Sequence, residues 1–253
     1  MVIDKAFKVA RIIKIVKNFP VYFYAYLSRT RGKSVVLKLK SGLNIKLRLN
    51  GSEVIAFNEQ WVNDVYGLAT LHVPPGGKIL DLGANCGCFS LRAAELWQHS
   101  TIYAVEPAPD TFSLLMHNIS CNNLSSRVRA INLAVAGFTQ KRKLSMDNSS
   151  GRRSLCDISS DIPTVSVDTV TLRDLFDRLG LSSINLCKMD IEGAEHEVFA
   201  TESLDVVRQV KCYVMEIHGS DRDRSSLLRK IALFGYHVTM LRDSIAVAVR
   251  IDG

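Results

Sequence analysis

The sequence predicts an α/β protein with a doubly wound, Rossmann-like sheet of mostly parallel strands. From Lys78 onward, short apolar strands alternate with helical segments, a rhythm typical of parallel strands joined by crossover helices. A glycine-rich turn, "DLGANCG", follows the first of these strands. The 253 residues, 47% hydrophobic and 23% charged, suffice for one such domain with a short extension.

Residues 1–30 form the first unit, in which basic and apolar residues alternate at roughly helical spacing. Pro20 should interrupt this helix. Two interpretations remain open. The helix packs its apolar face on the main domain, or it lies on an anionic membrane surface as a peripheral contact.

Residues 34–50 alternate between apolar and polar side chains on both sides of Ser41-Gly42, which predicts a β-hairpin. The first 50 residues are therefore expected to form a helix and hairpin extension, with the main domain over 51–253. A helix should follow the hairpin, with Ser52 as its N-cap and Gly67 as its end.

Seven strands and four helices are predicted after the proline and glycine cluster at 74–77. The strands are 78–83, 101–106, 128–134, 184–190, 210–217, 237–241 and 244–250. The helices are 90–98, 110–120, 196–203 and 225–235. The last two strands are too close together for a helix between them, so the last strand should be antiparallel.

Residues 134–184 interrupt the alternation and form an insertion. It should contain a strand at 141–146, a loop at 147–154, and a strand followed by a helix at 164–180. We expect the insertion and the N-terminal unit to shape the pocket for a bound molecule, with 147–154 as a mobile lid over it.

The glycine-rich turn lacks the spacing of a dinucleotide site. Counting from Gly83, Asn85 and Cys88 occupy the second and third glycine positions of G-x-G-x-x-G. Backbone amides in such a turn can hold a carboxylate as readily as a phosphate, and Asp81 could attract an ammonium group. The turn therefore favours a cofactor with an amino-acid end over a diphosphate. The plainer alternative is an ordinary junction between a strand and a helix.

Glu106 stands at the end of the next strand, 19 residues beyond Gly87. A carboxylate about 20 residues after a glycine-rich turn accepts the ribose hydroxyls in nucleotide-binding folds. The plainer alternative is a surface glutamate before a helix. Taken together, the turn and Glu106 predict a nucleoside with an amino-acid tail, which is S-adenosyl-L-methionine.

Two further strand ends carry candidate catalytic residues. They are Lys188, Asp190, Glu192, Glu216 and His218. The carboxylates could accept a substrate proton, and Asp190 and Glu192 could hold a divalent ion, although Mg²⁺ is not favoured. His218 is the natural general base because an ordinary histidine pKa lies near neutral pH.

These segments resemble the FkbM-type methyltransferases. The resemblance covers roughly residues 51–250 and is carried by "DLGANCGCFS", "AVEPAPDTFSLLMHNI", "INLAVAG", "VSVDTVTLRDLF", "CKMDIEGAEHEVF" and "MEIHG", in that order. It implies a class I S-adenosylmethionine-dependent O-methyltransferase acting on a hydroxyl of a sugar, glycolipid or polyketide-type natural product. The implied cofactor-binding residues are Asp81, Gly83, Ala84, Asn85, Gly87, Glu106, Pro107, Asn132, Leu133, Ala134 and Asp190.

Three alternatives carry less weight. The net charge of +7 admits an RNA methyltransferase, but nucleic acid is an unlikely partner because residues 190–193 lack the proline and aromatic residue of base-methylating sites. The turn argues against an NAD-linked oxidoreductase, and the acidic residues argue against a non-catalytic cofactor-binding module. The absence of C-x-x-C pairs, of a signal-peptide pattern and of long apolar runs predicts a cytoplasmic location, and residues 1–30 leave open a peripheral position at a membrane.

Overall fold

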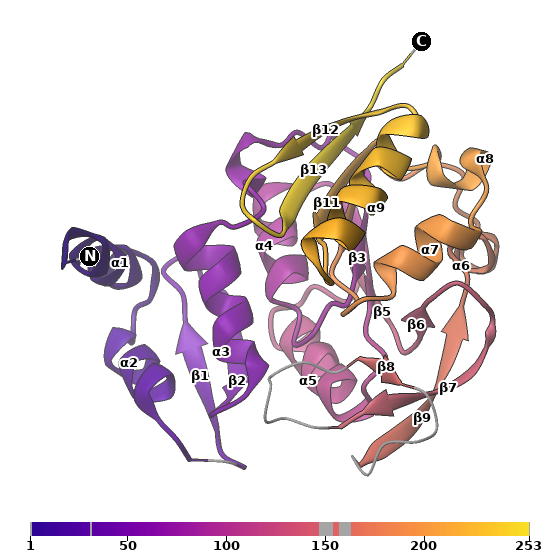
Figure 1. Ribbon diagram of the computed structural model, residues 1–253. Helices are drawn as coiled ribbons and strands as arrows, with labels where there is room; N and C mark the ends of the chain where they lie inside the picture. Colours follow the sequence, from indigo (N-terminus) through magenta and orange to yellow (C-terminus); the bar gives the residue numbers. More distant parts are fainter. Residues whose placement is uncertain (1, 31, 147–153, 157–162, 253) are drawn as a thin grey trace.

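A seven-stranded sheet forms the centre of the computed structural model, which describes residues 2–30, 32–146, 154–156 and 163–252 (Figure 1). In sheet order its strands are β12 (Tyr236–Met240), β13 (Ile245–Arg250), β11 (Cys212–Glu216), β10 (Leu186–Met189), β3 (Lys78–Leu82), β4 (Thr101–Val105) and β5 (Val128–Ile131). β13 runs antiparallel to both of its neighbours, and the pairs from β11 to β5 are parallel. The predicted fold class and the antiparallel last strand are confirmed.

Helices cover both faces of this sheet, as crossover connections require. One face packs against α4 (Cys88–Leu96) and α5 (Pro109–Ser120). The other packs against α6 (Leu172–Leu179), α7 (Glu195–Thr201), α8 (Leu204–Val207) and α9 (Asp221–Leu233). Since neighbouring side chains of a strand point to opposite faces, Ile79 belongs to the first core and Leu80 to the second.

The N-terminal unit consists of α1 (Val2–Ile15), α2 (Phe19–Leu27) and the antiparallel hairpin of β1 (Ser34–Lys38) and β2 (Asn44–Arg48). The helix is interrupted near Pro20, which lies in the first turn of α2, where a missing N–H is tolerated. Ile12 and Val16 are buried in the same core as α4 and α5. One face of α1 therefore docks on the rest of the chain.

The segment after the hairpin differs from its prediction at both ends. Gly51, not Ser52, is the N-cap of α3 (Ser52–Phe57), and the Ser52 hydroxyl instead accepts a hydrogen bond from Asn85 Nδ2 at 3.1 Å. The chain continues as a π-helix, η1 (Asn58–Asn63), and ends where Asp64 adopts a left-handed φ of 44°. Gly67 does not end this helix but precedes a short 3₁₀ turn, η2 (Leu68–Thr70).

The insertion builds a second, four-stranded sheet in the order β6 (Ala134–Val135), β9 (Thr164–Val170), β7 (Gln140–Ser145) and β8 (Leu155–Cys156). The prediction of one strand over 128–134 is wrong, since β5 and β6 belong to different sheets. The chain leaves the central sheet at Asn132, whose side chain donates to the carbonyls of Glu106 and Pro107 at 2.8 and 3.0 Å. The expected lid at 147–154 lies outside the described residues, apart from Ser154. Of the helices described here, none combines the length and the apolar character needed to cross a bilayer.

Candidate active site

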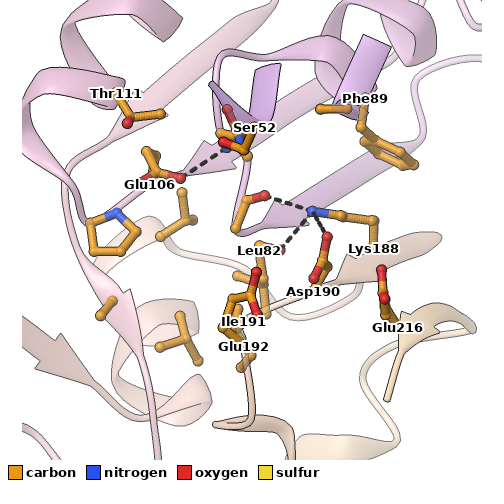
Figure 2. A pocket seen from close by; sticks show the side chains of 18 of the residues that line it. Ser52, Leu82, Phe89, Glu106, Thr111, Lys188, Asp190, Ile191, Glu192 and Glu216 are labelled. Carbon is orange, nitrogen blue, oxygen red and sulfur yellow. Dashed lines mark hydrogen bonds and ion pairs between the residues drawn. The ribbon is translucent and has the colours of Figure 1, made fainter. Parts of the chain in front are cut away.

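A cavity of about 310 Å³ opens at the carboxyl ends of β3, β4 and β10, where doubly wound sheets bind ligands. Its walls come from α3 and η1, from the turn between β3 and α4, and from the ends of β4, β10 and β11. Figure 2 shows Glu106 on one side of the pocket and Glu216 on the other, with Lys188 and Asp190 between them.

The turn between β3 and α4 forms one wall through Gly83, Ala84 and Asn85. Gly83 has a φ of 75°, and a Cβ atom there would lie 1.9 Å from the carbonyl oxygen of Asp190. Only glycine fits this position, because the end of β10 comes so close. Gly87, also expected at the cofactor, does not line the pocket, and an added Cβ would meet Leu115 at 2.8 Å.

Asp81 is fully buried and is not among the lining residues. Ser90 Oγ donates to Asp81 Oδ2 at 2.6 Å, and Lys188 Nζ lies 3.5 Å from Oδ1. Burial raises the pKa of Asp81, while Lys188 and the Ser90 hydroxyl oppose this rise. Asp81 therefore ties α4 and β10 to β3 from behind the pocket wall.

Glu106 lines the pocket and is held by two backbone groups. The amides of Asn85 and Ala108 donate to its two carboxylate oxygens, each at 2.9 Å. An ionised carboxylate has about four acceptor positions, so a fixed glutamate of this kind can also bind ligand hydroxyls. Pro107, Leu133 and Ala134 line the pocket close to it, whereas Asn132 only braces the strand end.

Lys188 is a buried cation between the strands. Its Nζ donates to the carbonyls of Gly83 at 2.6 Å and Leu82 at 3.2 Å, and it lies 3.5 Å from Asp190 Oδ2. Burial disfavours the ammonium, but the Asp190 and Asp81 carboxylates more than offset this effect and raise the pKa of Lys188. Lys188 thus stays charged and organises the turn instead of accepting a proton.

His218 is clamped between two glutamates. Its Nε2 lies 3.2 Å from Glu192 Oε2, and its Nδ1 lies 3.1 Å from Glu195 Oε1. Although burial favours the neutral ring, hydrogen bonds to Glu192 and Glu195 raise the pKa of His218 to about 10. The ring therefore favours the imidazolium form at neutral pH, which differs from the ordinary histidine pKa on which the general-base prediction relied.

Glu195 is a positioning residue that the sequence did not reveal. It is fully buried, and its two carboxylate oxygens accept the backbone N–H groups of Ile191 and Gly193, both at 2.9 Å. These bonds hold the loop that carries Glu192, whose φ is 56°. The sequence around Glu195 shows closely spaced acids and Gly193, which indicate a loop before a helix. This pattern does not show whether the first glutamate of that helix is buried or exposed to solvent.

Two more pocket acids complete the site. Glu59 comes from η1, and burial together with Asp190 and Glu216 raises the pKa of its carboxyl to about 7. Burial and the nearby Asp190 also raise the pKa of Glu216. The hydroxyl of Tyr66 donates to Asp190 Oδ2 at 3.3 Å. Glu59 and Tyr66 lie upstream of the sequence motifs, so the motif-based prediction missed them.

Asp190, Glu192 and His218 also have the spacing of a cation site. Within the described residues, one potential ligand atom from each lies within 4.8 Å of the other two. A histidine ligand must be deprotonated, however, and the two glutamates that clamp His218 favour its protonated form. In this arrangement the imidazolium itself supplies the positive charge between the carboxylates.

Comparisons with known proteins identify the family. The family described as "Methyltransferase FkbM domain" matches residues 81–242, more than half of the chain. "Methyltransferase 1" of Beauveria bassiana (strain ARSEF 2860) is 28% identical over 207 residues, which cover 73% of this chain and 81% of that protein. "31-O-demethyl-FK506 methyltransferase FkbM" of Streptomyces tacrolimicus is 25% identical over 224 residues, which cover 76% and 86%.

Among solved structures, a precorrin-6y C5,15-methyltransferase from Geobacter metallireducens GS-15 aligns with a TM-score of 0.47 and 13% identity, over 75% of this chain and 87% of that one. The family match spans the glycine-rich turn, the strand that ends at Glu106 and the acidic loop after β10. The chain belongs to the FkbM methyltransferase family and is an S-adenosylmethionine-dependent methyltransferase.

Proposed function

We propose that this enzyme is an O-methyltransferase whose acceptor is a hydroxyl of a sugar, glycolipid or polyketide-type natural product. The observation that carries the proposal is the charge of the pocket on the side away from Glu106. Four carboxylates line it, and they are Glu59, Asp190, Glu192 and Glu216. The cations among the described lining residues are Lys188 and His218. Such a surface favours a neutral acceptor rich in hydroxyl donors and disfavours phosphates.

The other side of the pocket suits S-adenosylmethionine. Glu106 would bind the ribose hydroxyls, Leu133 and Ala134 would flank the adenine, and the wall from Gly83 to Asn85 would receive the amino-acid end. Glu106 is already fixed by two backbone N–H groups, so binding does not require it to be ordered first. When bound, the cofactor supplies a methyl group on a positively charged sulfur, which is a good leaving group.

A pocket carboxylate would take the proton that the acceptor hydroxyl loses. Glu59 is the best suited of the four, because a base works best when its pKa lies near the operating pH and that of Glu59 is about 7. Asp190 and Glu192 would then orient the acceptor, with Lys188 and His218 holding them in place. His218 would act as a positioning cation.

The name of the Streptomyces tacrolimicus relative supports an oxygen acceptor, because it specifies a 31-O-demethyl substrate. RNA has less support, since three basic residues of the segment 127–142 are engaged in contacts within the chain. Arg142 pairs with Glu197 at 2.7 Å, Lys141 pairs with Asp168 at 3.2 Å, and Arg127 donates to main-chain carbonyls of α4 and the residue after it.

Calorimetric titration with S-adenosylmethionine tests the cofactor half of the proposal. Glu106→Gln should bind at least about tenfold more weakly, because its amide replaces one of the two ribose-binding oxygens. Glu95→Gln, on the far end of α4, serves as the control and should bind normally. Unchanged binding in the Glu106 variant would contradict the assignment.

Transfer of a labelled methyl group into fractionated cell extract tests the acceptor half. The product should resist mild alkali, as a methyl ether does, and should be found with glycans, glycolipids or polyketide-type products. Label recovered in RNA, or as an alkali-labile methyl ester, would overturn the O-methyl proposal while leaving the cofactor site intact.

A further inference from the structure

The net positive charge of the chain comes from its N-terminal segment. Residues 1–40 contain ten lysines and arginines and one acidic residue, a formal charge of +9, whereas the remaining residues carry −2. Several of these basic side chains are exposed and form no ion pair with any described residue. They are Lys14, Lys17, Arg29, Lys33, Lys38 and Lys40. A charge this localised attracts an anionic surface.

The same unit exposes large apolar side chains. Val9 and Ile13 lie one turn apart on α1 and are each 40% exposed, beside the buried Ile12 and Val16. Along α2 the exposed residues are Phe19, Tyr24, Tyr26 and Leu27, and Leu27 is 74% exposed. We call these side chains, together with the six exposed basic residues, the N-terminal basic face. In Figure 1 the two helices lie at the outer edge of the molecule, beyond β1 and β2.

We infer that the N-terminal basic face docks on the surface of an anionic lipid bilayer. Exposed tyrosine, phenylalanine and leucine beside lysine and arginine match the two layers of such a surface, since apolar groups enter the acyl boundary and basic groups remain among the headgroups. A nucleic acid would use the charge but would leave Leu27 and Ile13 in water. The apolar component therefore favours a membrane over RNA.

This face lies close to the pocket. α1 contacts η1, and η1 contributes Glu59 and Gln60 to the pocket wall. Ile55, one turn earlier on α3, also lines the pocket and is 57% exposed. Docking would bring this wall near the headgroup layer, which favours a membrane-borne acceptor such as a glycolipid among those proposed above. That last step rests on the proposed function.

Vesicle flotation without cofactor tests the docking itself. The full chain should float with phosphatidylcholine vesicles that contain phosphatidylglycerol, should not float with pure phosphatidylcholine, and should be released by high salt. Lys14→Gln/Lys17→Gln should weaken binding roughly 30-fold, because each basic residue near an anionic surface adds about fivefold. Leu27→Ser should weaken it by about tenfold.

Matched controls lie on α9, which packs on the opposite face of the sheet. Arg222→Gln/Arg229→Gln removes the same charge, and Leu233→Ser exchanges a side chain that is 85% exposed. Both control variants should bind like the unmodified chain. Failure of that chain to float, equal losses in the controls, or retention of RNA without flotation would each overturn the inference. None of these results depends on methyl transfer, so a failure here is distinct from a failure of the proposed reaction.

Discussion

At the scale of single residues, the pocket contains two cations whose charge is fixed by neighbouring carboxylates and one carboxyl that can change its charge. Lys188 and His218 are the described cations that line the pocket, and both are held by buried or half-buried carboxylates. Their raised pKa values keep them charged at neutral pH. Glu59 differs from them, because its pKa of about 7 allows it to change charge in the working range.

Glu59 should therefore govern the pH dependence of turnover. Its carboxyl is mostly protonated below pH 7 and mostly ionised above it, so kcat for methyl transfer should rise through about pH 7. Glu59→Gln should lower kcat by roughly 100-fold and abolish this rise. Steady-state rates between pH 5.5 and 8.5 test this, with Asp177→Asn on the outer surface of α6 as the control. A Glu59→Gln enzyme that kept the full pH-dependent rise would exclude Glu59 as the base.

The same residue gives a stability signature that is independent of catalysis. A carboxyl whose pKa is raised in the folded state contributes stability at low pH, and this contribution is lost as pH rises from 4.5 to about 7. The Glu59→Gln variant has no titrating carboxyl at this position, so it does not lose this stability as pH rises. Urea denaturation should therefore show similar stability for the two proteins near pH 4.5, and a gain of about 1–2 kcal/mol for the variant near pH 8. Solvent screening at the half-buried Glu59 keeps this gain below that of a fully buried carboxyl.

At the scale of elements, the turn between β3 and α4 and the loop after β10 form one unit. The carbonyl of Asp190 occupies the space where a Cβ of residue 83 would lie. Lys188 then joins the two segments through the carbonyls of Leu82 and Gly83. Residue 83 must therefore be glycine for two reasons, which are its left-handed φ and its close contact with the end of β10.

Gly83→Ala should be far more damaging than an alanine at an open left-handed site. Gly180 provides the comparison, since its φ of 63° is similar and nothing lies within 4 Å of the added Cβ. Gly180→Ala should cost about 1 kcal/mol from backbone strain alone. Gly83→Ala should cost at least about 3 kcal/mol and should also weaken cofactor binding. Chemical denaturation and calorimetry measure the two effects, and equal costs would mean that the contact with Asp190 is not what requires glycine.

The elements that sequence reasoning predicted well are those with a local signal. Each parallel strand is a short apolar run, and the helix after β9 begins at Thr171, whose side chain accepts from the Asp174 N–H. The prediction failed where distant segments decide the outcome. The strand expected over 128–134 divides at Asn132, which bonds to the carbonyl of Glu106 just after β4. The helix α3 continues as the π-helix η1, which contacts α1 and α4.

The candidate site divides in the same way. Glu106 and the acids after β10 stand at strand ends in recognisable motifs. The sequence therefore predicts that they lie close together, and in the structure they line one pocket. Glu59 and Tyr66 join them only through the packing of η1 and the segment after it against the sheet. The raised pKa of His218 depends on Glu192 and on Glu195, and Glu195 is 23 residues away in the chain. Neither effect leaves a local pattern in the sequence.

At the scale of the whole molecule, the N-terminal unit serves two surfaces at once. Its inner residues belong to the core that includes α4, α5 and one face of the sheet, where Trp61 stacks on Phe57 at 5.4 Å between ring centroids. Its outer residues form the N-terminal basic face. We therefore expect residues 1–50 to unfold together with the main domain, although sequence composition separates them.

Two neighbouring isoleucines separate these roles. Ile12 is 1% exposed and Ile13 is 40% exposed, so Ile12 points into the core and Ile13, about 100° further round α1, lies at the exposed boundary. Ile12→Ala should destabilise the whole protein by about 2–4 kcal/mol, with tryptophan fluorescence and circular dichroism following one urea transition. Ile13→Ala should change stability by less than about 0.5 kcal/mol and yet weaken flotation with anionic vesicles. Two separate transitions would mean that the N-terminal unit folds independently. Normal flotation of Ile13→Ala would remove α1 from the membrane contact.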